Sequence, residues 1–168
     1  MPNDSSFFTN EEGFTLADRF SELVKSTELF DVLVGYFYSS GFHAIYPALK
    51  ETGQIRILIG ISTSKETFNL ISQGNQLRQD EVISPAEVKE RVGEKVEAEM
   101  ADSEDTKIVE SGVQKFIEWI SSGKLIIKAY PSQNIHAKLY IMTFKEDDRD
   151  KGRVITGSSN FTRSGLMG

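Results

Sequence analysis

Residues 135–162 read IHAKLYIMTFKEDDRDKGRVITGSSNFT, and this stretch determines the fold that we expect of the chain. An apolar run follows Lys138, a charged segment occupies 145–151, and a second short run leads to Thr156. This order predicts two strands of a hairpin joined by a long charged loop. His136 and Lys138 are two residues apart, so on an extended chain their side chains point to the same face.

A turn of small polar residues, Gly-Ser-Ser-Asn at 157–160, follows the second strand directly. Such a turn lets the backbone come close to an anion and offers several hydrogen-bond donors. If the hairpin closes, this turn lies beside His136 and Lys138. A nucleophile or general base, a fixed cation and small donors then converge, which is typical of phosphate chemistry.

The segments His136-Ala137-Lys138 and Gly157-Ser158-Ser159-Asn160 together resemble the HxK…GSxN half-site of the phospholipase D superfamily. The longer pattern, His-Ala-Lys-Leu-Tyr at 136–140 with Gly-Ser-Ser-Asn-Phe-Thr at 157–162, is most similar to the phospholipase-D-like domains at the N-terminus of bacterial helicases. The motif covers about a sixth of the chain. The resemblance implies a metal-independent phosphodiesterase or nuclease domain that needs no cofactor and no metal. It also implies nucleic acid, most of all DNA, as the partner, and helicase domains elsewhere in the full-length chain.

In this superfamily a neutral imidazole attacks phosphorus to give a phosphohistidine, and a second histidine protonates the leaving oxygen. Carried over by resemblance, His136 is the nucleophile or the acid, and Lys138 holds the phosphate oxygens. Ser159 and Asn160 support them as members of the catalytic group. We expect three further residues to contact the substrate: Gly157, Ser158 and His43.

Two of these residues also have a structural interpretation. The Ser158 hydroxyl is as well suited to satisfying the backbone of its own turn. His43 follows a predicted strand end, where sites of α/β sheets gather, but it also suits the start of a helix, with a local hydrogen bond.

The reaction needs two half-sites, and this chain supplies one. His43 is followed by Ala44 and Ile45, so no second His-x-Lys is present. We therefore expect a homodimer that completes the site across a two-fold axis.

The family motif has an Asp five residues after the Lys, where this chain has Thr143. A threonine cannot supply the charge that we expect to orient the histidine. Asp147, Asp148 and Asp150 are candidates to replace it, or they form a solvated loop. Glu11, Glu12 or another carboxylate from elsewhere in the chain is the other candidate. The alternative function is therefore a catalytically weak or inactive module for nucleic-acid binding or dimerisation.

Composition limits the remaining classes. The 168 residues suit one domain, 1–168, with a net charge of −6 and no apolar run long enough for a membrane span. The absence of cysteine and of a secretory signal fits the cytoplasm. Residues 124–168 carry 8 basic and 4 acidic side chains, a local balance of +4 on an acidic body.

The pattern along the chain predicts an α/β domain: a mixed, largely parallel β-sheet flanked by helices on both faces. A charged helical segment is expected at about 80–105, on the surface or facing a partner. The chain stops at Gly168, just after a helix start at Thr162 or Ser164, which suggests a domain cut from a longer helicase-type protein. Strands are expected at 30–37, 55–61, 125–130, 139–142 and 153–156, and helices at 10–26, 42–51, 65–72, 86–101 and 106–121.

Overall fold

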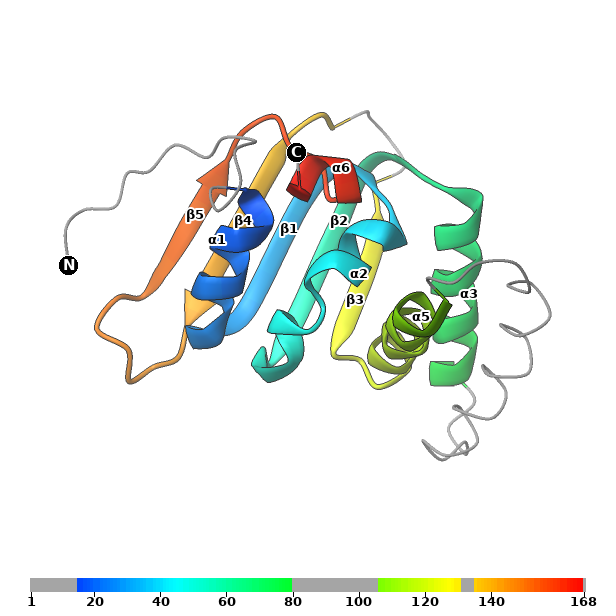
Figure 1. Ribbon diagram of the computed structural model, residues 1–168, viewed down its shortest axis with the longest axis horizontal. Coiled ribbons are helices and arrows are strands. Elements are labelled where there is room, and N and C mark those ends of the chain that lie inside the picture. Colours follow the sequence, from blue (N-terminus) through cyan, green and yellow to red (C-terminus); the bar gives the residue numbers. More distant parts are fainter. Residues whose placement is uncertain (1–14, 80–105, 131–134, 168) are drawn as a thin grey trace.

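A five-stranded sheet forms the centre of the molecule, with the strand order β3-β2-β1-β4-β5 (Figure 1). The computed structural model describes residues 15–79, 106–130 and 135–167. The strands are β1 (Thr27–Phe37), β2 (Gln54–Thr63), β3 (Leu125–Ala129), β4 (Lys138–Phe144) and β5 (Gly152–Thr156).

The strand pairing is mixed. β1 is parallel to β2, and β2 is parallel to β3. β4 is antiparallel to both of its neighbours, β1 and β5. Four strands therefore point the same way and β4 alone runs against them. This confirms the predicted α/β class with a mixed, largely parallel sheet, and it confirms the β4–β5 hairpin.

The helices gather over one face of the sheet (Figure 1). They are α1 (Leu16–Leu23), α2 (Ser39–Ile45), α3 (Lys65–Gln79), α5 (Thr106–Ser121) and α6 (Arg163–Met167), with 3-10 turns at Val24–Ser26 and Ala48–Glu51. The core lies between this layer and the alternate strand residues that face it, among them Phe30, Val32, Ile57 and Tyr140. α3 packs on α5, where the α-carbon of Gly74 comes so close to Ile120 that an added Cβ would lie 2.7 Å from its side chain.

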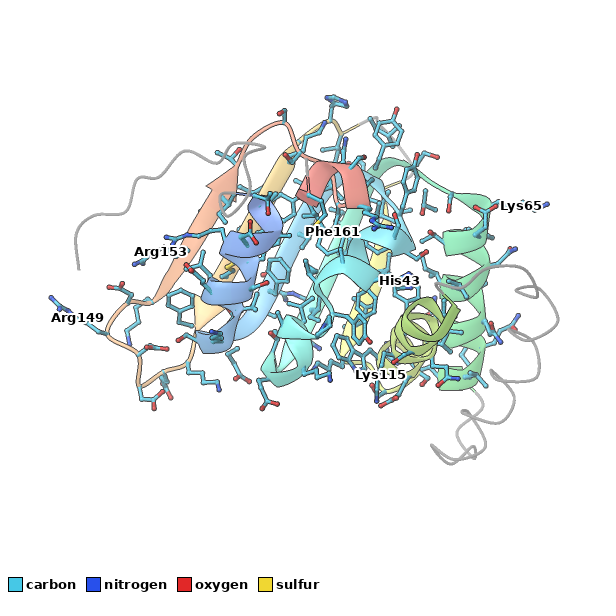
Figure 2. All side chains as sticks on the ribbon, in the orientation of Figure 1. His43, Lys65, Lys115, Arg149, Arg153 and Phe161 are labelled. Carbon is cyan, nitrogen blue, oxygen red and sulfur yellow. The ribbon has the colours of Figure 1, made fainter. Side chains whose placement is uncertain are left out.

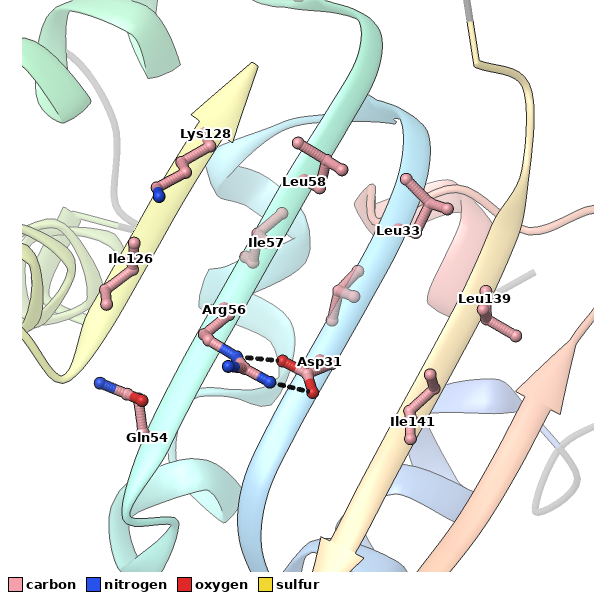
Figure 3. Close-up of a pocket in the computed structure, with 11 residues that line it drawn as sticks. Asp31, Leu33, Gln54, Arg56, Ile57, Leu58, Ile126, Lys128, Leu139 and Ile141 are labelled. Atoms are coloured by element: carbon pink, nitrogen blue, oxygen red, sulfur yellow. Dashed lines mark hydrogen bonds and ion pairs between the residues drawn. The ribbon is translucent and has the colours of Figure 1, made fainter. Parts of the chain in front are cut away.

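The opposite face differs from the expectation of helices on both sides. A groove of about 590 Å³ lies there, and every residue that lines it belongs to a strand (Figure 3). Asp31 and Arg56 form a two-pronged ion pair on this face, at 2.5 and 2.6 Å. The strands read as apolar runs in sequence, but these two charges mark the side that the described helices leave uncovered.

Several element boundaries also differ from the sequence prediction. The first helix begins at Leu16 because Thr15 caps it in a box with Asp18, whose carboxylate accepts from the Thr15 backbone N–H at 3.0 Å. The capping pair expected at Thr9 and Glu12 lies outside the described residues. α2 ends before Pro47, and α3 continues through Gly74 to Gln79. The charged helix expected at about 80–105 also falls outside the described ranges.

Across the described ranges, no helix combines the length and the apolar character that a membrane span requires.

Candidate functional site

The predicted motif lies at the edge of the sheet where the parallel strands end. After β3, the chain crosses over β2 to reach β4. Tyr130 donates its backbone N–H to the carbonyl of Ile59 at 2.9 Å, and Ile135 donates to the carbonyl of Gly60 at 3.0 Å. A Cβ on Gly60 would lie only 2.2 Å from the carbonyl oxygen of Ile135. The crossing therefore requires glycine at position 60, and it delivers His136 to the end of β1.

His136 lies above the second glycine of this edge, Gly35. A Cβ added to Gly35 would lie 3.4 Å from His136 Cδ2 and 3.6 Å from the side-chain oxygen of Asn160. The imidazole is exposed and meets the ring of Tyr36 edge-on, with 6.5 Å between centroids. The absence of a side chain at Gly35 thus leaves room for the histidine and the asparagine to approach each other.

Lys138 lies next to the histidine, as their spacing predicts. Its side chain is only 6% exposed, and its ammonium donates to the backbone carbonyl of His136 at 3.0 Å. The same Nζ lies 3.0 Å from both ring nitrogens. The two ring nitrogens direct their N–H bond or lone pair outward, in different directions within the ring plane. A Nζ atom at the same distance from both nitrogens therefore lies over the face of the ring and not in line with either nitrogen. The contact is therefore a cation held against the imidazole face.

The Gly-Ser-Ser-Asn turn closes the other side of this site. β5 ends with Thr156 opposite Leu139, and Gly157 donates its N–H to the carbonyl of Lys138 at 3.4 Å. Asn160 accepts from the backbone N–H of Tyr36 at 3.1 Å through Oδ1. The amide oxygen is occupied by this bond, and the Nδ2 group is the end of Asn160 that can donate to an anion.

The three remaining turn residues are arranged differently from one another. The carbonyl oxygen of Ser159 accepts from the hydroxyl of Tyr140 at 2.7 Å, which anchors the turn to the core. Ser158 and Gly157 are exposed, and a Cβ added at Gly157 would meet nothing within 4 Å. Gly157 also has no positive φ, so no backbone feature requires glycine there.

His43, the third residue expected at the substrate, lies elsewhere. It belongs to α2 and packs against α5, where a Cβ on Gly112 would lie 2.8 Å from its ring (Figure 2). Burial lowers the pKa of His43 to about 4, and its Nε2 is buried with no hydrogen-bond partner among the described residues. His43 therefore takes part in helix packing and not in the group around Gly35. The local hydrogen bond expected of a helix-start histidine is absent at this nitrogen.

The hairpin-loop carboxylates considered as replacements for the motif Asp are also distant. β4 runs away from the site, so Thr143 lies five residues beyond Lys138, about 16 Å along the strand. Asp147, Asp148 and Asp150 follow β4 in the hairpin loop, and Asp150 pairs with Arg153 there at 2.5 Å. None of these positions can orient the His136 ring, and neither could an aspartate at position 143. Glu11 and Glu12 lie outside the described residues.

Charge is distributed unevenly along this hairpin. The four acidic residues of 124–168 all lie in the loop at 145–151, at the far end of β4 and β5. The stretch from 152 to 168 contains two arginines and no acidic residue. The basic residues outside this loop are spread over the domain: Lys138 lies beside His136, whereas Arg153 pairs with Asp150 at the loop end of β5.

Sequence reasoning did not identify Gly35, Gly60, Tyr36 and Tyr140 as site residues. The two glycines interrupt apolar strand runs, and an isolated glycine inside a strand indicates close approach of another chain segment. That signal was present in the sequence. The roles of Tyr36 and Tyr140 depend on tertiary contacts, which no local pattern encodes.

The described part of the chain gathers no cluster of three or more His, Cys, Asp or Glu side chains that could hold a metal ion. The geometry thus defines an α/β domain with a histidine, a lysine and an asparagine at the carboxyl edge of its sheet. Comparison with known proteins gives no match to a family model and none to a curated protein.

Proposed function

We propose that the chain is a phospholipase-D-like domain that processes nucleic acid as a metal-independent phosphodiesterase or nuclease. One observation carries the proposal: His136, with Lys138 bonded to it at the start of β4, meets Asn160 of the turn after β5 over Gly35 at an exposed edge. These groups are the nucleophile, the cation and the neutral donor that phosphoryl transfer needs. Association with helicase domains and a cytoplasmic location belong to the proposal, on the basis of the motif and the cysteine-free sequence.

The proposed reaction has two steps. A neutral ring nitrogen of His136 attacks phosphorus, a P–N bond forms, and the bond to the leaving oxygen breaks. A second histidine, protonated, gives its proton to that oxygen. Water then attacks phosphorus while the second histidine takes its proton; a P–O bond forms, the P–N bond breaks, and His136 is released as the neutral imidazole. Lys138 and the Asn160 amide balance the charge on the non-bridging oxygens in both steps.

The second histidine comes from another copy of this chain in this proposal. His43 is the only other histidine, and its ring is packed between α2 and α5. The exposed His136 can instead face the His136 of a second protomer across a two-fold axis. The homodimer is thus a requirement of the chemistry.

The direct test measures hydrolysis of bis(p-nitrophenyl) phosphate and of labelled DNA in excess EDTA. His136→Ala should abolish turnover, and Lys138→Met, which keeps the apolar stem, should reduce it at least 100-fold, as for loss of an oxyanion donor. Lys151→Ala, in the far hairpin loop, is the matched control and should retain the wild-type rate. Equal rates for wild type and His136→Ala would reject the enzymatic proposal.

The dimer requirement has its own test. Wild type and His136→Ala are mixed in equal amounts and allowed to exchange subunits. If both histidines are needed, only wild-type pairs are active, and roughly a quarter of the activity of an all-wild-type sample remains. If half of the activity of the all-wild-type sample remains, each protomer works alone.

A second candidate function is a nucleic-acid-binding or dimerisation module without catalysis. It is favoured by the state of Lys138, whose buried ammonium is already bonded to the His136 carbonyl and must turn to meet a phosphate. In that case Lys138→Met weakens DNA binding and lowers its salt dependence, while no protein hydrolyses either substrate.

A further inference from the structure

A second cleft, of about 500 Å³, lies between the beginnings of α2 and α6. Its size is in the range of small-ligand sites. Six residues line it: Tyr38, Ser40, Thr162, Arg163, Ser164 and Met167. None of them was assigned a role in the chemistry at His136.

The two walls of the cleft are fixed to each other and to the core. Phe37 and Phe161 form a parallel bridge, and Tyr38 donates its backbone N–H to the carbonyl of Phe161 at 3.1 Å. Gly41 allows this contact, because a Cβ there would lie 2.7 Å from the same carbonyl oxygen. The Phe161 ring is fully buried and packs on Phe37 with 5.3 Å between centroids. The cleft is therefore a feature of the folded domain, and its walls do not depend on one loop.

The cleft adjoins the proposed phosphate site through both of its walls. Asn160 holds the N–H of Tyr36 with its side chain, and its own carbonyl accepts from the N–H of Thr162 at 2.9 Å. Tyr38 lies two residues beyond Tyr36 on one wall, and Arg163 directly follows Thr162 on the other. A polymer whose phosphate sits at Asn160 would thus reach the cleft with its next unit.

The lining combines the groups that a nucleotide needs. Arg163 is the single charged residue of the lining; it is exposed, and the described residues offer it no ion-pair partner. Tyr38 exposes 37% of its surface, and Met167 exposes 49%. Arginine is suited to phosphate, whereas an exposed aromatic ring offers a stacking platform for any base. The hydroxyls of Ser40 and Ser164 add neutral hydrogen-bonding groups.

We propose that this cleft binds the nucleotide next to the scissile phosphate of a single strand. Arg163 contacts the flanking phosphate, and the base stacks on Tyr38. This inference rests on the proposed function, because the strand has to be positioned by the site at Asn160. It adds a substrate requirement: an unpaired base beside the reacting phosphate.

The test measures binding of a fluorescein-labelled oligothymidylate by anisotropy at low salt, with all proteins carrying His136→Ala so that no cleavage occurs. Arg163→Ala and Tyr38→Ala should each weaken binding about tenfold. Arg163→Ala should also lower the salt slope by about one unit. The matched controls are Arg149→Ala, in the hairpin loop, and Phe68→Ala, a 60% exposed ring on α3; both should bind as the parent does.

An oligonucleotide with an abasic position beside the cleavage point separates the two contacts. Its binding should be weak and insensitive to Tyr38→Ala, yet still sensitive to Arg163→Ala. Tyr38 is the N-cap residue of α2, but its side chain makes no capping hydrogen bond, so Tyr38→Ala leaves the start of the helix intact. Circular dichroism checks the fold of each variant.

Hydrolysis by proteins with an intact His136 distinguishes failure of the cleft from failure of the proposed function. Arg163→Ala should lower kcat/KM on the oligonucleotide about tenfold and leave kcat/KM on bis(p-nitrophenyl) phosphate, which has no flanking nucleotide, unchanged. If hydrolysis depends on His136 but neither cleft variant alters oligonucleotide binding or cleavage, the cleft proposal fails and the enzyme proposal stands. If Arg163→Ala weakens oligonucleotide binding but no protein hydrolyses either substrate, the proposal of a nucleotide-binding cleft is supported and the proposal of an enzyme is rejected. Binding of a phosphorylated peptide in preference to the oligonucleotide would overturn the assignment to nucleic acid.

Discussion

The hydroxyl of Tyr140 donates to the carbonyl oxygen of Ser159 at 2.7 Å, and this bond connects the core to the Gly-Ser-Ser-Asn turn. The Tyr140 ring is 1% exposed and packs against Phe20 and Phe161, with centroid distances of 5.0 and 6.3 Å. Burial raises the pKa of the Tyr140 phenol well above its usual range, so the hydroxyl stays protonated and can donate at neutral pH. The Tyr140 side chain of β4 therefore anchors the turn from beneath, in addition to the bond between Asn160 and the Tyr36 N–H.

Tyr140→Phe should destabilise the domain by about 1 kcal/mol, because the ring still fills its place while the Ser159 carbonyl loses its donor. We expect DNA hydrolysis to fall as well, since the turn loses its anchor to the core. Urea denaturation measures the first effect and kcat the second. Tyr130→Phe removes a hydroxyl from a 43% exposed ring and should alter neither. Unchanged stability and rate in Tyr140→Phe would show that the bond has no positioning role.

Gly60→Ala should destabilise the domain by about 1–3 kcal/mol, because the new methyl group meets the backbone of Ile135 in the crossing segment. The shift of that segment should displace His136 and reduce turnover. Gly157→Ala is the matched control: its Cβ meets nothing and its φ is not positive, so stability should stay within about 0.5 kcal/mol. Thermal denaturation of both variants provides the comparison, and equal shifts would contradict the proposed close crossing.

Stability should fall on acidification between about pH 6.5 and pH 4 because of His43. Its folded pKa is about 4, below the ordinary value of 6.5, so the unfolded chain binds a proton that the folded chain excludes. The neutral ring stabilises the fold fully above pH 6.5, and this contribution is lost as the pH approaches 4. Denaturant titrations should show wild type losing up to roughly 1.4 kcal/mol per pH unit more than His43→Gln. Parallel pH profiles of the two proteins would rule out a buried neutral His43.

Thr143→Asp introduces the aspartate that the phospholipase D motif has five residues after its lysine, and it should change the hydrolysis rate less than twofold. The reason is geometric, because position 143 lies near the end of β4 that pairs with the start of β1, far from His136. Stability should change by no more than about 0.5 kcal/mol at this exposed position. Steady-state kinetics on bis(p-nitrophenyl) phosphate measures the rate. A tenfold gain would mean that the aspartate influences the histidine over a distance, contrary to this prediction.

Much of the site-bearing half of the fold could be predicted from local sequence. Apolar runs and turn residues were sufficient for β4, β5 and the contact of the turn with Lys138, because a hairpin is closed by residues that are near in sequence. The helix over 106–121 also agrees with its apolar periodicity. These elements depend on contacts between residues that are close in sequence, and sequence patterns predict such contacts best.

The errors arose where distant segments decide the outcome. The apolar run around Asp31 suggested a strand covered on both faces, but the ion pair with Arg56 lies on a face that the described helices do not cover. The helix expected at 65–72 continues to Gln79, because Gly74 packs closely on Ile120 of α5. His43 was placed near the chemistry because it follows a strand end, and α5 determines its surroundings instead. In each case the deciding neighbour is far away in sequence.

The connection between β4 and β5 lies at the end of the sheet opposite α6 (Figure 1), with Arg149 at its tip and Phe161 near the other end (Figure 2). The two strands act as a spacer between this loop and the edge that carries His136. An engineer could therefore lengthen the loop, shorten it or graft a fluorescent reporter into it without displacing that edge.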